Sequence, residues 1–491
     1  MEIRDIASAM QKYLSRSNRN TAYIPYTTVM QECYAWYRNL TDWHNYFIYN
    51  GLRRVKQERA KLGMAKTVCE DWASLLLNEK VAITTDSQAE NDKINEVLEY
   101  NNFSVEANKL VELMFALGTG AFVETWNGER VVLDYIQGDM IFPLAWDNGV
   151  ITECAFAKIG GSLKDAKFTV IMHTLENGEY VIKTVELDGN GGVCRPTRPI
   201  QVAYGLRTVE EENKEFTSII YTQSSVPCFQ IIKPNIVNNY DKTNPLGMGI
   251  IYNAVDILKS VDTEYDSYLN EFNLGKKRIF VKSGLKSIKM LDNAKDKRNS
   301  IVNHIDPNDT MYYTLNSEND DGKLPIEIFD PTLRTNEHNI ALNTQLNLLS
   351  RKVGLGAGYY EFQGGNVART ATEIVSMNSS LFRNLCKHEL VMTTALTGMC
   401  KAILNLYNLY GGTNFDIDTE ITIDYDDSII DDTEKAQQKA MAEFNAGLID
   451  QVEYFALTRK LTREQATKFV AEMKATDTMK EVSSLMNSFG I

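Results

Sequence analysis

The stretch IYNAVDILKSVDTEYDSYLNEFNLGKKR, residues 251–278, decides the fold that we expect. Its apolar residues recur at alternating spacings of three and four, which indicates one helix with a narrow apolar seam. The seam residues are Ile251, Ala254, Leu258, Val261, Tyr265, Tyr268 and Phe272. A helix of about 27 residues, roughly 40 Å long, would carry them. Gly275 is expected to end that helix, and a seam of this kind predicts packing within or between chains rather than contact with a nucleic acid.

A second long helix is expected after a turn-rich insert. The insert begins with basic residues, of which the first also suit the negative end of the preceding helix dipole. They are Lys276, Lys277, Arg278, Lys282, Lys286, Lys289, Lys295, Lys297 and Arg298. Asp330 as N-cap and Pro331 at the first helical position would open the second helix. Its Leu342, Leu346, Leu349 and Val353 share one face, so we expect it to run back along the first helix.

A glycine-rich loop and a third helix follow. The loop is GLGAGYYEFQGGNVART, residues 354–370, and it lacks the G-x-G-x-x-G pattern because Tyr359 stands where the third glycine would be. Thr370 and Glu373 form a capping box, which predicts that a helix begins there. Its apolar stripe continues to Gly411-Gly412, so this helix approaches 40 residues, or about 60 Å.

The N-terminal half is expected to be α+β. Helical spacing covers Val55–Leu77 and Val105–Leu117. Short strands are then separated by turns such as Asn148-Gly149 and Asn177-Gly178. The expected strands are Ala121–Trp126, Arg130–Tyr135, Ile151–Lys158, Phe168–His173, Tyr180–Glu186 and Phe216–Tyr221. This half therefore reads as a helical entry followed by an antiparallel β-rich unit.

The C-terminal end is expected to be a small helical domain. A strand at Glu420–Tyr425 lies in an acidic run that ends near Glu434, and helices are predicted at Thr433–Ala446 and Gln451–Arg459. Thr462 and Gln465 make a second capping box before a last helix. The acidic run could hold a divalent cation, but we favour a solvated strand edge and charges at a helix N-terminus.

Composition limits the function. The chain has 44% hydrophobic and 24% charged residues, which is ordinary for a globular protein. Its seven cysteines contain no C-x-x-C pair, so neither a disulfide framework nor a zinc site is indicated. Its first residues lack the apolar core of a signal peptide, and we expect no membrane segment. A net charge of −14 argues against a protein that binds nucleic acid over its whole surface.

No pattern in the sequence predicts catalysis. The five histidines are far apart, and neither an H-E-x-x-H motif nor a nucleophile elbow is present. We therefore expect no enzyme, no cofactor and no metal.

Three stretches together resemble the portal proteins of long-tailed bacteriophages, specifically the family typified by the portal of Bacillus phage SPP1. They are NPLGMGIIYNAVDILKSVDTEYDSYLNEFNLGKKRIFV, VGLGAGYYEFQGGNVARTATEIVS and ITIDYDDSIIDDTEKAQQKAMAEFNAGLI, and the resemblance covers most of the chain. Its most specific parts are the Asn-Pro-x-Gly entry to the first long helix and the Gly-rich loop that ends in Thr370-Ala371-Thr372-Glu373.

The resemblance implies a division of this α+β chain into the parts of a portal subunit. Residues 1–244 and 371–428 would form the wing, and helices at 245–274 and 332–353 would form the stem. Residues 275–331 would be the clip, 354–370 the tunnel loop and 429–491 the helical crown. Long paired helices cannot bury both faces in one subunit, and a head-to-tail interface that closes into a ring would solve this.

The resemblance also implies a function and partners. Twelve subunits would form a ring at one capsid vertex of the virion, assembled in the host cytoplasm, as the channel for DNA packaging and ejection. The expected partners are other copies of the chain, non-specifically bound double-stranded DNA, major capsid or scaffolding protein, the terminase large subunit, which supplies the ATP chemistry, and a head–tail adaptor. The candidate DNA-facing residues of the tunnel loop are Tyr359, Tyr360, Phe362, Gln363, Asn366 and Arg369. The candidate basic residues of the stem and clip are Lys276, Lys277, Arg278, Lys282 and Lys286.

Two other readings remain open at this point. One is a metal-dependent DNA-processing enzyme with its site in the Asp424–Asp432 cluster. The other is a head–tail adaptor without a DNA channel. The length of the chain and its order of helix, insert and helix argue against the adaptor, and an activity assay with added magnesium would separate the enzyme from the portal.

Overall fold

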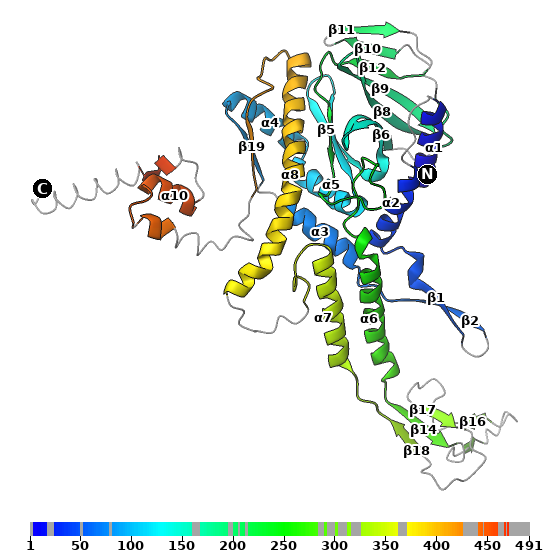
Figure 1. Cartoon of the computed structure of the whole chain (residues 1–491). Coiled ribbons are helices and arrows are strands. Elements are labelled where there is room, and N and C mark those ends of the chain that lie inside the picture. Colours follow the sequence, from blue (N-terminus) through cyan, green and yellow to red (C-terminus); the bar gives the residue numbers. More distant parts are fainter. Residues whose placement is uncertain are drawn as a thin grey trace, which may run out of the picture.

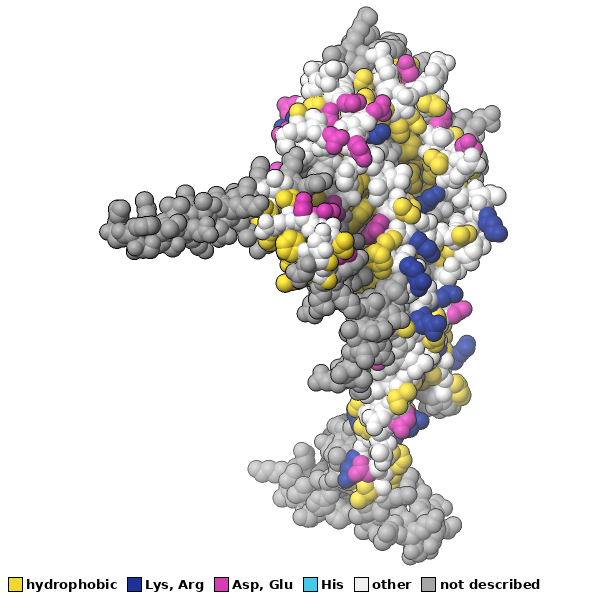
Figure 2. Space-filling view, turned by 60° about the vertical axis from the view of Figure 1, so that its left-hand side comes forward, with side chains coloured by type: hydrophobic (Ala, Val, Ile, Leu, Met, Phe, Trp, Pro, Cys, Tyr) yellow, Lys and Arg dark blue, Asp and Glu magenta, His cyan; other side chains and the backbone are white. Residues whose placement is uncertain are grey.

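The structure is a computed structural model of the 491-residue chain. It describes residues 3–16, 24–49, 53–77, 81–159, 167–194, 200–204, 207–211, 215–282, 289–291, 300–302, 312–315, 326–361, 371–425, 440–444, 446–459, 466–467 and 469–470. Figure 1 shows a broad upper body of mixed helices and strands, from which two long helices descend side by side to a small group of strands. Figure 2 shows acidic side chains mainly on the upper body, whereas Lys and Arg side chains gather where the helix pair joins it and continue downward.

The upper body contains a seven-stranded sheet in the order β11-β10-β12-β9-β8-β7-β6. Its strands are β6 (Ile141–Asp147), β7 (Val150–Ile159), β8 (Lys167–Glu176), β9 (Glu179–Asp188), β10 (Ile200–Tyr204), β11 (Arg207–Glu211) and β12 (Ser218–Tyr221). Strands β6 to β9 form an antiparallel meander. Asn148-Gly149 and Asn177-Gly178 both adopt positive φ, which two-residue hairpin turns require, so the predicted turns are confirmed.

A second, three-stranded sheet and several helices complete the upper body. The sheet has the order β13-β4-β5, from β4 (Gly120–Trp126), β5 (Val131–Gln137) and β13 (Phe229–Ile232). The helices are α1 (Ile3–Arg16), α2 (Ile24–Tyr37), α3 (Met64–Leu76), α4 (Gln88–Tyr100), α5 (Phe103–Leu117) and α8 (Ala371–Tyr410). Strand β19 (Ile421–Asp424) pairs with β3 (Ala82–Thr85), so the chain returns to the N-terminal half after α8.

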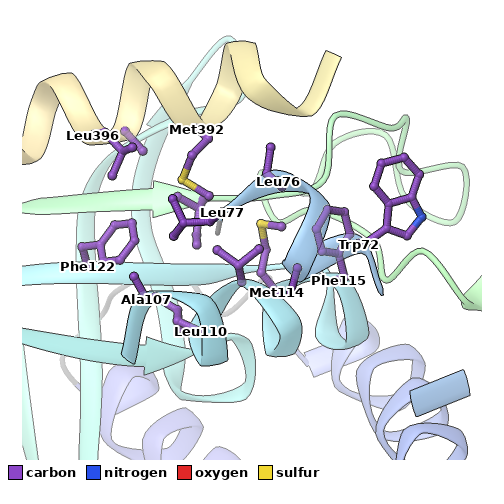
Figure 3. Packing of buried hydrophobic residues seen from close by; sticks show 14 of the residues in the cluster. Trp72, Leu76, Leu77, Ala107, Leu110, Met114, Phe115, Phe122, Met392 and Leu396 are labelled. Carbon is purple, nitrogen blue, oxygen red and sulfur yellow. The ribbon is translucent and has the colours of Figure 1, made fainter. Parts of the chain in front are cut away.

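The main core joins α3, α5, β4 and α8 (Figure 3). Trp72, Phe115 and Phe122 are fully buried in it, and the rings of Trp72 and Phe115 stack with their centroids 5.6 Å apart. By length and composition alone Ser380–Tyr410 could cross a membrane, but 61% of the apolar 18-residue window within it is buried inside the protein. The contacts of Met392 and Leu396 with this core identify α8 as a core helix, and its 40 residues confirm the predicted length.

The two glycines of the Leu-Gly-Met-Gly segment before the helix pair allow close backbone contact with the end of α5. A Cβ atom on Gly247 would lie 2.2 Å from the carbonyl oxygen of Gly118, and one on Gly249 would lie 2.3 Å from that of Ala116. The amide of Ile250 donates a hydrogen bond of 2.9 Å to the carbonyl of Phe115. Because no side chain fits between these backbones, the segment fixes where the helix pair leaves the upper body.

The helix pair consists of α6 (Val255–Leu274) and α7 (Thr335–Lys352). Leu258, Val261, Leu346 and Leu349 are buried at its upper end. The lower seam residue Phe272 is 41% exposed, so the seam is covered by this chain only in its upper half. Helix α6 has 20 residues rather than the expected 27 and begins at Val255, directly after a 3-10 turn at Tyr252–Ala254.

The predicted start of α7 at Asp330 and Pro331 is wrong. The helix begins at Thr335. The backbone N–H of Arg334 donates instead to the side chain of Glu271 on α6, at 3.0 Å. This contact between the two helices holds residues before Thr335 outside the helix.

Small strands lie beneath the helix pair. β14 (Arg278–Lys282) lies between β17 (Tyr312–Leu315) and β18 (Ile326–Phe329), parallel to the first and antiparallel to the second. β15 (Lys289–Leu291) pairs with β16 (Ser300–Val302). The sequence predicted a turn-rich insert between the two long helices, and the resemblance implied an α/β clip there. The elements of this insert among the described residues are the strands β14 to β18.

The predicted helix at Val55–Leu77 is correct only in its second part, as α3. Its first residues belong to a hairpin of β1 (Asn45–Tyr49) and β2 (Arg54–Glu58). Valine and charged residues in V-K-Q-E fit an alternating strand as well as a helix, and pairing with β1 decides between them. No range was predicted for several elements of this half, namely α1, α2, α4, β3, β6, β10, β11 and β13. Helix α10 (Gln451–Arg459) has the predicted bounds, whereas the Thr462–Gln465 capping box lies outside the described residues.

Glu124 on β4 is a buried carboxyl whose pKa should make stability depend on pH. It is fully buried, neither side-chain oxygen has a hydrogen-bond partner among the described residues, and burial raises its pKa well above 4.5. The folded state therefore holds this proton more tightly than the unfolded state, and stability is lost as the pH rises above about 4.5 toward the folded pKa.

We expect Glu124→Gln to remove this dependence. The stability of the variant relative to the natural chain should rise by about 1.4 kcal/mol per pH unit between pH 4.5 and the folded pKa. Urea unfolding midpoints at pH 5, 6, 7 and 8 would measure the difference. A difference that stays constant across this range would show that Glu124 does not titrate as its burial requires.

Candidate functional site

The first part of the glycine-rich loop is a tight turn at the upper end of α7. Gly354, Gly356 and Gly358 have φ values of +88°, +92° and +78°. Residues with side chains rarely adopt such angles, so the alternating glycines of GLGAG specify this path. The glycines therefore shape the loop between 354 and 358 rather than simply allowing it to move.

Three elements hold this turn. The indole N–H of Trp72 on α3 donates to the carbonyl of Val353 at 3.1 Å. Asn384 on α8 donates to the carbonyl of Gly354 at 2.8 Å, and the amide of Gly358 donates to Asn347 on α7 at 2.5 Å. The loop thus leaves α7 from a position fixed to the core of the upper body.

The structure places the two loop tyrosines differently. The Tyr360 hydroxyl donates to Asp71 on α3 at 2.6 Å, and its amide donates to the hydroxyl of Ser350 at 3.2 Å. Burial, and then the bond to Asp71, raise the pKa of Tyr360, so its phenol stays protonated. Tyr359 is 39% exposed, and burial of the rest of its ring raises its pKa to about 12.

Tyr359 is therefore the more exposed of the two loop tyrosines. Contact with DNA stays a prediction for both tyrosines. The candidates Phe362, Gln363, Asn366 and Arg369 lie outside the described residues.

The candidate basic residues lie at the lower end of α6. Lys276 and Lys277 are exposed, and Lys277 forms an ion pair with Asp330 at 3.2 Å. Arg278 begins β14, and Lys282 ends it opposite Leu315 of β17. The Lys282 side chain and all of Lys286 lie outside the described residues. The described members thus form a basic end to the helix pair that is partly neutralised by Asp330.

An ion-pair cluster that the sequence did not reveal joins α6 to α7 just above this end. The Arg334 guanidinium donates to both oxygens of Glu271, at 3.2 and 2.7 Å, and His338 lies 2.7 Å from Glu264. The hydrogen bonds from Arg334 lower the pKa of Glu271 to about 2. These residues are 63 and 74 positions apart, and only the pairing of the helices brings them together.

A second surface missed in the sequence is apolar. Exposed large hydrophobic side chains occur on the helix pair and on the residues at its base. They are Leu269, Phe272, Leu274, Ile328, Phe329, Leu333, Ile340 and Leu348. Ile340 and Leu348 are eight residues apart and so lie on one side of α7, away from the buried Leu342, Leu346 and Leu349. The spacing of Ile340 and Leu348 was the signal in the sequence that could have revealed this apolar surface. We call the eight exposed residues the outer stem surface.

Nothing in the described part of the chain resembles a metal centre. No group of three His, Cys, Asp or Glu residues among the described residues could hold an ion. Of the acidic cluster proposed for a metal-dependent enzyme, Asp424 ends β19 and residues 426–432 lie outside the described residues.

Comparison with known proteins gives one match that covers nearly the whole chain. A family model described as "Phage portal protein, SPP1 Gp6-like" matches residues 17–481. None of the curated proteins matches. Similar solved structures include "Virion of native gene transfer agent (GTA) particle", with 10% identity and a TM-score of 0.41 over 80% of this chain and 89% of that chain. "Neck of native GTA particle computed with C12 symmetry" has 11% identity and a TM-score of 0.39 over the same shares.

Proposed function

The chain belongs to the SPP1 Gp6-like family of phage portal proteins, and from that premise we propose that it is the subunit of a closed twelve-membered ring at one vertex of a viral capsid. In this proposal α6 and α7 are the stem, and β14 to β18 form the clip. Residues 354–370 are the tunnel loop, residues 1–244 and 371–428 the wing, and residues 429–491 the crown. The role is structural, and we assign no reaction to the chain.

The observation that carries the ring is the outer stem surface. Eight large apolar side chains on or below a thin pair of helices are exposed in the single chain. Burying a Leu, Ile or Phe side chain contributes about 1.5–3 kcal/mol, so leaving this surface in water is unfavourable. A neighbouring copy that covers it head-to-tail repeats the same contact around a closed ring.

The tunnel loop is the part of the subunit that we propose touches DNA. Hydrogen bonds to α3, α7 and α8 fix its start at the top of the stem, and Tyr359 in this part of the loop is 39% exposed. An aromatic and amide-rich loop can meet a passing duplex without sequence preference. The chain's net charge of −14 would disfavour tight binding of phosphates overall and so let the DNA slide.

The ends of the ring would bind its partners. We propose that the basic lower end at Lys276 and Lys277 belongs to the surface that meets terminase during packaging and the head–tail adaptor afterwards. The wing would meet major capsid or scaffolding protein. The assembly would form in the host cytoplasm and remain in the virion.

Electron cryo-microscopy of the assembly with a duplex held in its channel tests this function. We expect a closed ring whose inner wall carries residues 354–370, with Tyr359 among the protein atoms nearest the DNA. A ring with this loop on its outer rim would contradict the proposed DNA contact and leave the ring itself intact.

A further inference from the structure

The hairpin of β1 and β2 projects sideways from the level where the stem meets the upper body (Figure 1). In the described part of the chain its two strands pair only with each other. Phe47 and Tyr49 on one face are 59% and 70% exposed, and Ile48 on the other face is also exposed. A two-stranded hairpin is marginally stable in water unless a face is packed, so these side chains indicate a missing partner.

The base of the hairpin is nevertheless held firmly to the stem. His44 and Asp262 of α6 are both buried and lie 2.8 Å apart. The other oxygen of Asp262 accepts from the amide of Leu62, and Asp266 accepts from the amide of Ala60, each at 2.9 Å. These bonds tie both ends of the hairpin to the same helix, so its direction is set by α6.

Arg59 stiffens the base further. Its guanidinium lies 4.5 Å from the ring centroids of both Trp43 and Tyr46, and it donates to the carbonyl of Trp43 at 2.7 Å. A rigidly mounted hairpin with exposed aromatic residues loses little conformational entropy when it binds. The hairpin therefore has the properties of a preformed docking element rather than of a flexible loop.

The charge of the hairpin identifies the kind of surface that it fits. Residues 45–61 contain five basic side chains and one acidic side chain, in a chain whose net charge is −14. The basic residues are Arg53, Arg54, Lys56, Arg59 and Lys61. Arg59 packs on Trp43 and Tyr46. Lys61 pairs with Glu58 at 2.7 Å within the chain. The rest of the chain is strongly acidic, and a second copy offers a complementary surface.

We propose that the hairpin of each subunit packs against the neighbouring copy, as a second contact continuous with the outer stem surface. This inference rests on the proposed ring, because it takes the neighbour to be the next subunit of that ring. Phe47, Ile48 and Tyr49 supply the apolar contact, and Arg54 and Lys56 face acidic side chains of the neighbour. The stem contact alone would join subunits along thin helices, and the hairpin widens that contact.

A photoreactive phenylalanine analogue at position 47 of the full-length chain tests the contact. Illumination of purified assemblies should give covalent dimers and longer ladders, with the adduct mapped to a peptide of the neighbouring copy. The same analogue at Tyr100, an exposed tyrosine at the end of α4, is the matched control for random collision.

Two double variants measure what the hairpin contributes. Phe47→Ser with Tyr49→Ser should raise the concentration for half-assembly about tenfold, as should Arg54→Glu with Lys56→Glu at low salt. Thermal unfolding of each dissociated variant should match the natural chain, since the altered side chains are exposed. Intact rings without adducts at position 47 would contradict the proposed hairpin contact but not the proposed ring. Failure of the natural chain to form a ring would overturn the proposed function and this inference with it.

Discussion

Replacing Ile340 and Leu348 together with glutamate is expected to abolish ring assembly while the subunit still folds. Both residues are on the exposed side of α7, with 68% and 46% of their surface accessible in the single chain. Their substitution should therefore change the free energy of folding by less than about 0.5 kcal/mol. In the ring they would be buried, and each interface would lose apolar burial and gain two carboxylates that cannot be hydrated.

A loss of about 4 kcal/mol per interface raises the concentration for half-assembly roughly a thousandfold. Analytical ultracentrifugation of the purified variant should therefore show only monomer where the natural chain forms a large particle. The control carries the same two glutamates at Val150 and Leu175, exposed residues beside hairpin turns of the seven-stranded sheet. Assembly of the Ile340/Leu348 variant at normal concentration would show that the outer stem surface is not the ring interface.

Trp72→Ala is expected to lower the free energy of unfolding by about 3–5 kcal/mol. Trp72 is fully buried, stacks on Phe115 and meets the ring of His388 edge-on at 4.9 Å. Its indole N–H is also the donor that holds Val353 where the tunnel loop begins. Truncation leaves a large cavity between α3, α5 and α8, and the loop loses one of its attachments.

Trp72→Phe separates packing from hydrogen bonding, because it keeps an aromatic ring and removes the donor. It should cost less than half as much as alanine in urea unfolding followed by circular dichroism. Proteolysis within residues 354–361 should increase in both variants. An alanine variant destabilised by less than about 1 kcal/mol would mean that α3 and α8 do not share the core shown in Figure 3.

The long helices could be predicted because their determinants are local. Helix α8 begins at Ala371 directly after the predicted cap and has the expected 40 residues. The Asn-Gly turns could also be predicted, because two-residue hairpin turns need positive φ and Asn and Gly adopt it more readily than other residues. The start of α7 was mispredicted because a distant residue, Glu271, binds the Arg334 amide. No local pattern contains that partner.

The candidate site was less predictable for the same reason. The sequence indicated a loop rich in glycine and aromatic residues, but it could not show that Asp71 binds the hydroxyl of Tyr360 from 289 positions away. Nor could the sequence distinguish an apolar side chain that is buried in the core of this chain from one that is exposed on its surface. Leu346 and Leu348 are two residues apart, and only the packing of α6 against α7 shows that the first is buried and the second exposed.

Particle images of the purified full-length protein, viewed along the assembly axis, test most directly whether this chain closes into a ring around a channel. We expect a closed ring of twelve subunits, with α6 and α7 of each subunit surrounding the channel and the tunnel loop beside them. Monomers at assembly concentrations, or open filaments without a central channel, would contradict it.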